Sequence, residues 1–241
     1  MLFIQKYFLY SFMNIFIYWE GKIPFYIQKC INRMKDIFKE NLILLDNNSI
    51  KKYVPKFPKY FDKIKHIALK VDYLRIALLY YNPGIYLDAD CIVFPGFLEF
   101  LKFQSEKEFI GLGKENIIDN NSFLISTKKE SEVLKNILEE QEIIIIKKKG
   151  KLEWTNIGGN LIKEISKKYP EKCLTLDKSP LAFFGWKNSE IFISLDENII
   201  KKYLEKCKKY NGVMLYNKVM KKHFMKSIPE NCLLWFIFEK N

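Results

Sequence analysis

Hydrophobic and polar positions along the chain predict short strands that alternate with helices. Asn14–Tyr18 is an apolar run typical of a buried strand. Pro24 suits the first turn of a helix, and apolar residues at helical spacing carry that helix to about Asp36. A second strand, a long helix and a third strand are then predicted at Leu42–Leu45, Lys65–Tyr81 and Ile85–Leu87. This β-α-β-α-β order implies an α/β sandwich, in which ligands bind at the carboxyl ends of the strands.

The rest of the chain continues the same alternation. The unbroken run Ile143–Ile146 leaves open whether it ends a helix or forms a strand. The apolar runs predict strands at Cys91–Phe94, Phe109–Leu112, Ser122–Ser126, Leu174–Leu176, Ile191–Ser194 and Gly212–Tyr216. Helices are expected at Lys129 to about Lys148, within Thr155–Tyr169 after a turn through Gly158-Gly159, and at Asn198–Tyr210.

No internal repeat, low-complexity linker or composition shift marks a second domain. We therefore expect a single domain over residues 13–241, preceded by an extra N-terminal segment over residues 1–12, for which a helix is one interpretation. The stretch up to Trp19 is strongly apolar, but polar residues interrupt it and no small-residue cleavage site follows. A signal peptide or a membrane span is therefore only weakly supported.

The long predicted helix carries charged residues among apolar ones. Asp72 and Arg75 are three residues apart and share a helix face, while their neighbours are apolar nearly all round. A helix that is apolar on most sides is buried, and buried charges need partners. Two interpretations are open. One is a structural ion pair of Asp72 and Arg75, with Asp88 or Asp90 as a further partner, and the other is a pair that holds a polar ligand.

Asp88 and Asp90 directly follow the third predicted strand. An extended backbone points side chains two residues apart in the same direction. Such a pair is often a solvated turn, but here it lies inside an apolar run, where two carboxylates repel each other and lose solvation. A divalent cation resolves this, and Mg²⁺ or Mn²⁺ is often bound through one or two carboxylates and substrate phosphates. The pattern therefore predicts a metal–diphosphate site.

The chain is strongly basic. Its 241 residues hold 40 Lys and Arg against 28 Asp and Glu, which gives a formal net charge of +12. Such a charge suits nucleic acid, an anionic membrane surface or a nucleotide diphosphate. Only Arg33 and Arg75 are arginines, and base readers and phosphate clamps favour arginine. We therefore expect an anionic small molecule and no nucleic-acid partner.

The composition also bounds the core and the compartment. With 49% hydrophobic residues, the chain can bury a substantial core. Its five cysteines are widely spaced and include no Cys-x-x-Cys pair, which argues against a disulfide scaffold or a zinc site. We expect buried free thiols in a reducing compartment.

The helix motif and the strand motif together resemble a known enzyme family. Beyond these two motifs, a looser similarity to the same family covers most of residues 14–220. It includes the first strand with Trp19, a mid-chain strand with Asn121, and a turn at residues 155–159. In that turn Gly159 stands where the family usually has proline. The two motifs, Lys70-x-Asp72-x-x-Arg75 and Gly84-Ile85-Tyr86-Leu87-Asp88-Ala89-Asp90, are similar to the core of glycosyltransferases with a DXD-containing sugar-binding region, namely family 32 retaining transferases and bacterial capsular polysaccharide synthesis proteins.

The resemblance implies a GT-A type fold, with a Rossmann-like central mixed sheet flanked by helices, and a nucleotide-sugar donor, with a UDP-sugar expected. Asp88 and Asp90 would bind the donor ribose and Mn²⁺ or Mg²⁺, with Asp90 the firmer ligand. Asp72 and Arg75 would hydrogen-bond the donor sugar. The expected catalytic residues are therefore Asp72, Arg75 and Asp90, and Lys70 counts among the donor-binding residues.

The resemblance gives weaker roles to three further positions. Trp19 would lie near the nucleobase, where an aromatic face can stack, although a core tryptophan at a strand end explains it equally well. Asn121 and Gly158-Gly159 would lie around the sugar or the acceptor. Turn chemistry is the simpler explanation for each of these taken singly.

The sequence departs from the family near its C-terminus. The family often has a His-Leu-Trp-Asn-like stretch there, with the histidine near the metal and the diphosphate. Here the stretch begins with Met214 and ends with Asn217, and methionine is a poor ligand for a hard cation. Asn217 is our candidate for the third metal ligand, and His223 is the alternative. A metal site that is incomplete would fit a relative that binds nucleotide sugars without turnover.

With this resemblance, we expect a metal-dependent glycosyltransferase; the resemblance implies transfer to a glycan or lipid-linked saccharide acceptor, with retention of configuration, in surface polysaccharide synthesis. The alternative is a non-catalytic nucleotide-sugar-binding relative. Because nucleotide sugars are cytoplasmic, we expect a cytoplasmic protein, with peripheral contact at the inner face of the membrane through the apolar N-terminus and surface lysines.

Overall fold

The computed structural model describes residues 13–102, 105–154, 156–176 and 180–240, and these form two compact units. The first unit comprises the described residues within Met1–Glu20, Ile43–Asp88 and Gln104–Asp177. The second comprises those within Gly21–Leu42, Ala89–Phe103 and Lys178–Asn241. One boundary between the units falls between Asp88 and Ala89, inside the Asp-Ala-Asp motif.

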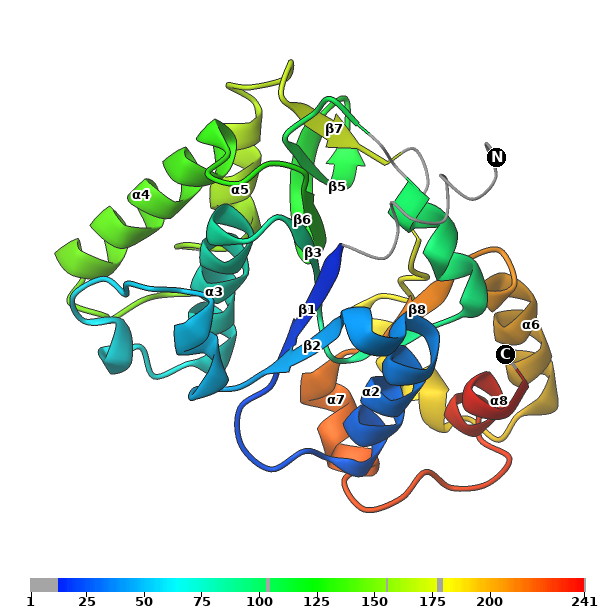
Figure 1. Cartoon of the computed structure of the whole chain (residues 1–241). Coiled ribbons are helices and arrows are strands. Elements are labelled where there is room, and N and C mark those ends of the chain that lie inside the picture. Colours follow the sequence, from blue (N-terminus) through cyan, green and yellow to red (C-terminus); the bar gives the residue numbers. More distant parts are fainter. Residues whose placement is uncertain (1–12, 103–104, 155, 177–179, 241) are drawn as a thin grey trace. The chain divides into compact units, whose positions relative to one another are not determined.

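A six-stranded mixed sheet forms the centre of the first unit, with the order β2-β1-β3-β6-β5-β7 (Figure 1). The β1–β3 and β5–β7 pairs are parallel, whereas β3–β6 and β5–β6 are antiparallel. The strands are β1 (Asn14–Tyr18), β2 (Leu42–Leu45), β3 (Gly84–Leu87), β5 (Phe109–Lys114), β6 (Ile117–Ser126) and β7 (Cys173–Thr175). The expected mixed sheet flanked by helices is confirmed.

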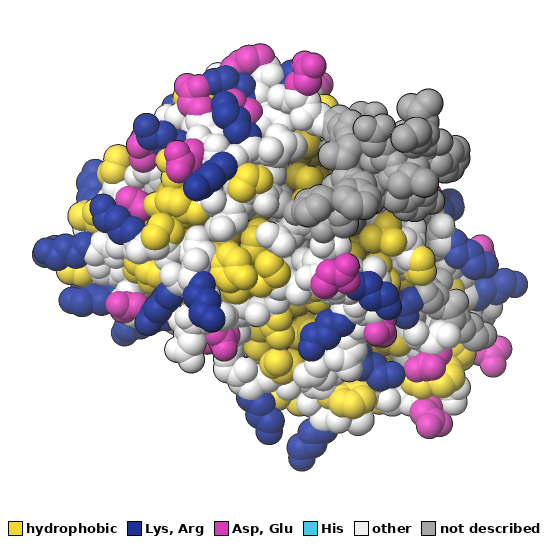
Figure 2. Space-filling model, viewed as in Figure 1, with side chains coloured by type: hydrophobic (Ala, Val, Ile, Leu, Met, Phe, Trp, Pro, Cys, Tyr) yellow, Lys and Arg dark blue, Asp and Glu magenta, His cyan; other side chains and the backbone are white. Residues whose placement is uncertain are grey.

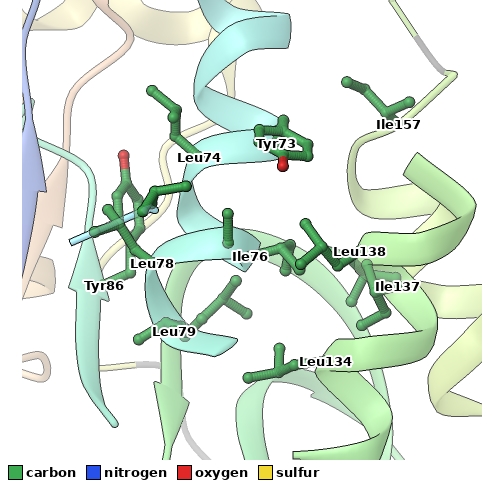
Figure 3. Packing of buried hydrophobic residues seen from close by; sticks show 14 of the residues in the cluster. Tyr73, Leu74, Ile76, Leu78, Leu79, Tyr86, Leu134, Ile137, Leu138 and Ile157 are labelled. Atoms are coloured by element: carbon green, nitrogen blue, oxygen red, sulfur yellow. The ribbon is translucent and has the colours of Figure 1, made fainter. Parts of the chain in front are cut away.

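Three helices gather on one side of this sheet, namely α3 (Ile67–Tyr81), α4 (Glu132–Lys147) and α5 (Gly159–Ser166) (Figure 1). The short 3-10 turns η3 (Ser49–Lys52) and η4 (Phe61–Lys63) precede α3. Helix α3 lies between the sheet and α4, which explains why its sequence is apolar on nearly every side. Figure 3 shows this packing, with Tyr73, Leu74, Ile76, Leu78 and Leu79 of α3 near Tyr86 of β3 and near Leu134, Ile137 and Leu138 of α4.

The start of β3 depends on a close backbone approach. Strands β1 and β3 pair in parallel, with Asn14 opposite Gly84. A Cβ atom added at Gly84 would lie 2.5 Å from the carbonyl oxygen of Asn14. Glycine is therefore needed where the chain leaves the Asn82-Pro83 stop and enters the sheet. The pairing brings the carboxyl ends of β1 and β3 to the same edge of the sheet, where Asp88 follows β3.

The second unit is built mainly from helices around a two-stranded antiparallel ribbon of β4 (Cys91–Val93) and β8 (Gly212–Met214). Helix α2 (Phe25–Phe38) packs on β4, and the side chain of Arg33 donates a 2.7 Å hydrogen bond from Nε to the carbonyl of Val93. The other helical elements are η2 (Lys39–Asn41), η5 (Pro95–Lys102), η6 (Trp186–Ile193), α6 (Glu197–Cys207), α7 (Asn217–His223) and α8 (Leu233–Lys240).

Several expectations from the sequence are corrected or resolved. The strand expected at Ile191–Ser194 is wrong, because most of this stretch belongs to the 3-10 helix η6. The ambiguous run Ile143–Ile146 lies within α4 and is helical. Helices α7 and α8 were not expected. All five cysteines are free and buried, as the sequence indicated.

Two expectations about the chain ends and the domain boundaries stay predictions. The proposed extension, residues 1–12, lies outside the described residues. Thr155, in the turn at residues 155–159 that resembles the family, also lies outside them. The assignment of residues 13–241 to one domain stays a prediction beside the two compact units. Within the part of the chain that the structure describes, no helix is both long enough and apolar enough to cross a membrane.

Candidate functional site

Arg75 is the centre of a buried polar cluster in the first unit. Its side chain is only 5% exposed, and its guanidinium lies with Nη2 3.5 Å from Oδ1 of Asp72 and 3.3 Å from Oδ1 of Asp88. Cζ of Arg75 also lies 5.1 Å from the centre of the Tyr86 ring. The ion pair of Asp72 and Arg75, with Asp88 as a further partner, is therefore confirmed.

Asp88 is held at the end of β3 by its backbone as well as its side chain. Its N–H donates a 3.0 Å hydrogen bond to the carbonyl of Ser122 in the neighbouring strand β6. This fixes the direction in which the chain leaves the sheet. The first carboxylate of the Asp-Ala-Asp motif thus lies at the carboxyl edge of the sheet, where the α/β pattern predicted a ligand site.

Asn121 joins the same cluster through both its side chain and its backbone. Its Nδ2 donates a 2.8 Å hydrogen bond to Oδ1 of Asp72, and its carbonyl accepts a hydrogen bond from Nη1 of Arg75. The expected neighbourhood of Asn121, Asp72 and Arg75 is therefore present in the structure. Whether Asn121 contacts a sugar stays a prediction.

Gly158 lies against the other oxygen of Asp72. A Cβ atom added at Gly158 would come within 2.7 Å of Oδ2 of Asp72 and 3.6 Å of Nδ2 of Asn121. A residue with a side chain would therefore displace the carboxylate from its present position. Gly159, the first residue of α5, instead packs toward the carbonyl of Asp119, at 3.0 Å from an added Cβ.

Gln141 is a residue of this region that the sequence did not reveal. It is fully buried on α4, and its Nε2 donates hydrogen bonds to the carbonyls of Asp72, at 3.0 Å, and Ile157, at 2.7 Å. It therefore ties the backbone of α3 to the turn that carries Gly158. A single glutamine among the charged residues of an amphipathic helix gives no signal in the sequence that would have identified it.

The electrostatics of the cluster favour a ligand that donates hydrogen bonds. Burial, together with the charge of Asp88, raises the pKa of Asp72 to about 6 against the opposing effects of Arg75 and Asn121. Burial also raises the pKa of Asp88. Two carboxylates face one guanidinium, so hydroxyl groups that donate to the carboxylates would stabilise their ionised form.

The other expected donor residues of the first unit lie on neighbouring elements. Trp19 follows β1 and is half-buried, and its backbone N–H donates a 2.9 Å hydrogen bond to the carbonyl of Leu45. The preceding Tyr18 donates a 2.6 Å hydrogen bond to Oδ1 of Asn47. Lys70 is half-buried on α3, two residues before Asp72. A role for Trp19 at the nucleobase and for Lys70 at the donor stays a prediction.

Asp90 belongs to the second unit, where it contacts the start of α7. It is buried, its Oδ2 accepts a 3.0 Å hydrogen bond from the N–H of Asn217, and its backbone carbonyl accepts one from Leu215 at 2.9 Å. These bonds join the loop after the Asp-Ala-Asp motif to the C-terminal stretch, residues 214–217. The expected association of Asp90 with Asn217 is therefore present.

The side chain of Asn217 is oriented by Tyr26 of α2, another residue that the sequence did not single out. The hydroxyl of Tyr26 donates a hydrogen bond to Oδ1 of Asn217. Burial, with a further contribution from the charge of Asp90, raises the pKa of Tyr26, so this hydroxyl stays protonated at neutral pH. Carboxylate and carboxamide oxygens are the hard donors that Mg²⁺ and Mn²⁺ prefer, and Asp90 and Asn217 fit such a cation by their chemistry.

The remaining C-terminal candidates do not add metal ligands to this pair. Sδ of Met214 lies 3.3 Å from Sγ of Cys91, in the pairing of β4 with β8, and His223 is exposed at the end of α7, beside the ring of Phe224. Among the described residues, no group of three or more His, Cys, Asp or Glu side chains is arranged to hold a metal ion.

The matched family model covers most of these residues. Residues 18–122 match the model described as "Glycosyltransferase sugar-binding region containing DXD motif". The match includes Trp19, the Asp72–Arg75 pair, the Asp-Ala-Asp motif and Asn121, and it leaves Gly158 and Asn217 outside. The chain therefore contains a glycosyltransferase-like sugar-binding region. No curated protein matches the sequence.

Solved structures with a similar arrangement include two glycosyltransferases. The apo form of the glycosyltransferase GlyE of Streptococcus pneumoniae TIGR4 has a TM-score of 0.51 at 11% sequence identity, over 94% of this chain and 59% of that one. PaToxG Glycosyltransferase has a TM-score of 0.46 at 16% identity, over 86% of this chain and 81% of that one. The chain thus spans 59% of the length of GlyE, and the likeness to GlyE shows a shared fold.

Proposed function

We propose that this protein is a glycosyltransferase that moves a sugar from a nucleotide-sugar donor to a saccharide acceptor. The donor that we propose is a UDP-sugar. The observation that carries the proposal is the buried cluster of Arg75, Asp72 and Asp88 at the carboxyl edge of the sheet. It lies within the stretch that matches a glycosyltransferase sugar-binding region.

In this proposal the cluster orients the donor sugar. Asp72 accepts hydrogen bonds from sugar hydroxyls, and Arg75 fixes Asp72 and Asp88 in place through its bonds to both. Asn121 holds Oδ1 of Asp72, and Oδ2 lies toward Gly158, whose missing side chain leaves room for the carboxylate in this position. Sugar transfer passes through an oxocarbenium-like state, so a fixed carboxylate near the sugar would stabilise the charge that develops.

The proposal includes a divalent cation, Mn²⁺ or Mg²⁺, held in the second unit by Asp90 and Asn217, with Asp90 as the firmer ligand. When bound, such a cation neutralises the charge that develops on the leaving diphosphate. The structure supports this through the chemistry of the donor set, because Asp90 is a buried carboxylate beside Asn217. In the first unit, Arg75 compensates the charge of Asp88.

The acceptor and the location are proposed from chemistry. We assign the acceptor to glycans or lipid-linked saccharides, the stereochemistry to retention, and the process to bacterial surface polysaccharide synthesis, all from the resemblance of the motifs to family 32 and capsular enzymes. Nucleotide sugars are cytoplasmic, and the five free thiols suit that compartment. A lipid-linked acceptor would place the protein at the inner face of the membrane.

A second candidate function is a nucleotide-sugar-binding relative without turnover. The observation that favours it is Met214, which packs on Cys91 where the family resemblance suggests a histidine. A softer, apolar side chain at this position weakens the hold on a hard cation.

The test is a panel of nucleotide sugars with Mn²⁺, followed by thermal shift and by release of nucleoside diphosphate. A glycosyltransferase gives both stabilisation and release for the same donor. Stabilisation without release over the whole panel, with acceptor saccharides present, supports the binding protein. Neither stabilisation nor release contradicts both functions.

A further inference from the structure

We infer that the tip formed by the start of α3 and the end of α4 binds an anionic lipid surface. We call residues 63–67 and 143–151 the α3–α4 tip. All of it lies in the first unit, apart from the polar cluster around Arg75. The inference deepens the peripheral location proposed above and rests on it, but it does not depend on sugar transfer.

The two segments of the tip meet because α3 and α4 run antiparallel. At one end Glu130 N–H bonds the carbonyl of Tyr80, and further along the hydroxyl of Tyr73 donates a 3.0 Å hydrogen bond to Glu142. Beyond α4, a Cβ atom added at Gly150 would lie 2.9 Å from Cβ of Lys63. The end of α4 and the residues before α3 therefore form one continuous surface.

The tip exposes large apolar side chains. Ile67 is 44% exposed at the start of α3, and Ile143 and Ile146 are 55% and 45% exposed on α4. Ile143 and Ile146 are three residues apart and share a helix face. Isolated exposed apolar residues are ordinary, but three isoleucines on two adjoining helix ends form a surface that gains by leaving water.

Lysines lie near these isoleucines in sequence, whereas Glu139 and Glu140 lie one helical turn before Ile143. The two segments hold exposed lysines and no Asp or Glu, and the nearest acidic residues in sequence are Asp62, Glu142 and Glu153. Figure 2 shows hydrophobic side chains next to Lys or Arg side chains over the edge of the first unit where α4 lies, with some Asp or Glu side chains among them. The lysines are Lys63, Lys65, Lys147, Lys148, Lys149 and Lys151.

An anionic bilayer is the partner that satisfies both features. Lysines are drawn to the anionic headgroups of the cytoplasmic leaflet, and apolar side chains enter the boundary between headgroups and acyl chains. A nucleic acid offers phosphates to the lysines but no apolar layer to the isoleucines, and the tip holds no arginine to read bases. The exposed isoleucines therefore favour lipid.

The experiment is vesicle flotation of the full chain without a nucleotide sugar. Vesicles of phosphatidylcholine alone are compared with vesicles in which roughly a third of the lipid is phosphatidylserine. We expect binding to the anionic vesicles only, weakening as salt is raised. Each lysine near an anionic surface raises the affinity about fivefold. The double variant Lys147→Glu with Lys148→Glu should therefore lower vesicle binding by roughly tenfold or more.

Two further variants separate this surface from a general effect of charge. Ile143→Ser with Ile146→Ser should lower vesicle binding several-fold without a change in net charge. Lys201→Glu with Lys202→Glu on α6 changes the net charge as much as the tip variant does, and it should leave binding within about twofold of the wild type. All these positions are exposed, so the variants should keep the thermal midpoint of the wild type.

Several outcomes would overturn the inference. The first is a wild type that does not bind anionic vesicles. The second is a loss of vesicle binding in the α6 lysine variant equal to that in the Lys147→Glu, Lys148→Glu variant. The third is wild-type vesicle binding by the Ile143→Ser, Ile146→Ser variant. The last would indicate a generic anion-binding surface, as for nucleic acid or an acidic protein. If the protein transfers sugar but does not bind anionic vesicles, only the lipid-binding role of the α3–α4 tip is refuted. If it binds these vesicles but transfers no sugar, only the proposed activity is refuted.

Discussion

The guanidinium of Arg75 lies 3.3 Å from the carboxylate of Asp88, so a residue of helix α3 holds the first carboxylate of the Asp-Ala-Asp motif. The helix motif and the strand motif, 13 residues apart in sequence at these positions, thus form one buried cluster. In the first unit this cluster links the packing of α3 to the chemistry proposed at the edge of the sheet. Its stability and its function can be tested separately.

Removing the charge of Arg75 should destabilise the fold. In Arg75→Met, Asp72 and Asp88 stay buried without their cation, and breaking such a pair costs about 3–5 kcal/mol. Urea unfolding at neutral pH measures this loss. In an Asp72→Asn background the same substitution should cost less, because one of the two carboxylates is already neutral. Equal costs in both backgrounds would show that the charge of Asp72 adds nothing to the stabilisation by Arg75.

Adding a methyl group at Gly158 should disturb Asp72. In Gly158→Ala the new Cβ would meet Oδ2 of Asp72 at 2.7 Å, so the carboxylate or the turn must move. We expect a loss of about 1–3 kcal/mol in the free energy of unfolding, together with weaker donor binding. The cost should shrink when Asp72→Ser shortens the facing side chain. A neutral Gly158→Ala variant would contradict the packing seen at this turn.

Gln141 should position the turn without touching a ligand. Gln141→Met keeps the length of the side chain but removes the donors to the carbonyls of Asp72 and Ile157, and unmet buried carbonyls cost about 1–3 kcal/mol each. A matched control is Gln28→Met on α2, whose side chain bonds only the nearby Asn32 among the contacts described. Equal unfolding free energies for the two variants would argue against a positioning role for Gln141.

The raised pKa of Asp72 gives stability a direction with pH. Its pKa is about 6 in the folded protein and about 3.9 in an unfolded chain, so the folded state binds more protons between these values. Stability should therefore fall as pH rises from about 4 to about 6, by at most roughly 3 kcal/mol. Asp72→Asn should flatten this part of the profile. A wild-type profile that rises throughout this range would contradict the raised pKa.

The sequence predicted the central part of the fold because its signals are local. The apolar run of β3, the stop at Asn82-Pro83 and the helical spacing in α3 each act within a few residues. The shared face of Asp72 and Arg75 follows from helix geometry, and a position for Asp88 or Asp90 at the strand end follows from strand order, although the sequence did not choose between these two as the partner of Arg75. These parts of the candidate site could therefore be inferred before any coordinates.

Other features depend on contacts between distant residues. The apolar run Ile191–Ser194 suggested a strand, but Phe192 is buried within a 3-10 helix. Helix α7 begins at Asn217, where its first N–H bonds Asp90, 127 residues earlier in the chain. The same holds for Gln141 and Tyr26, whose partners lie far away in sequence. A hydrogen bond of this kind leaves no periodic mark in the sequence.

The central claim is that the chain transfers sugar from a nucleotide-sugar donor at a site that includes Asp90. The most direct measurement is the release of nucleoside diphosphate from the best donor of the panel in the presence of Mn²⁺, for the wild type and Asp90→Asn side by side. We predict that the wild type releases nucleoside diphosphate and that Asp90→Asn releases it about 100-fold more slowly, because the variant loses a charged ligand near the diphosphate. Equal rates in the two proteins would contradict the account.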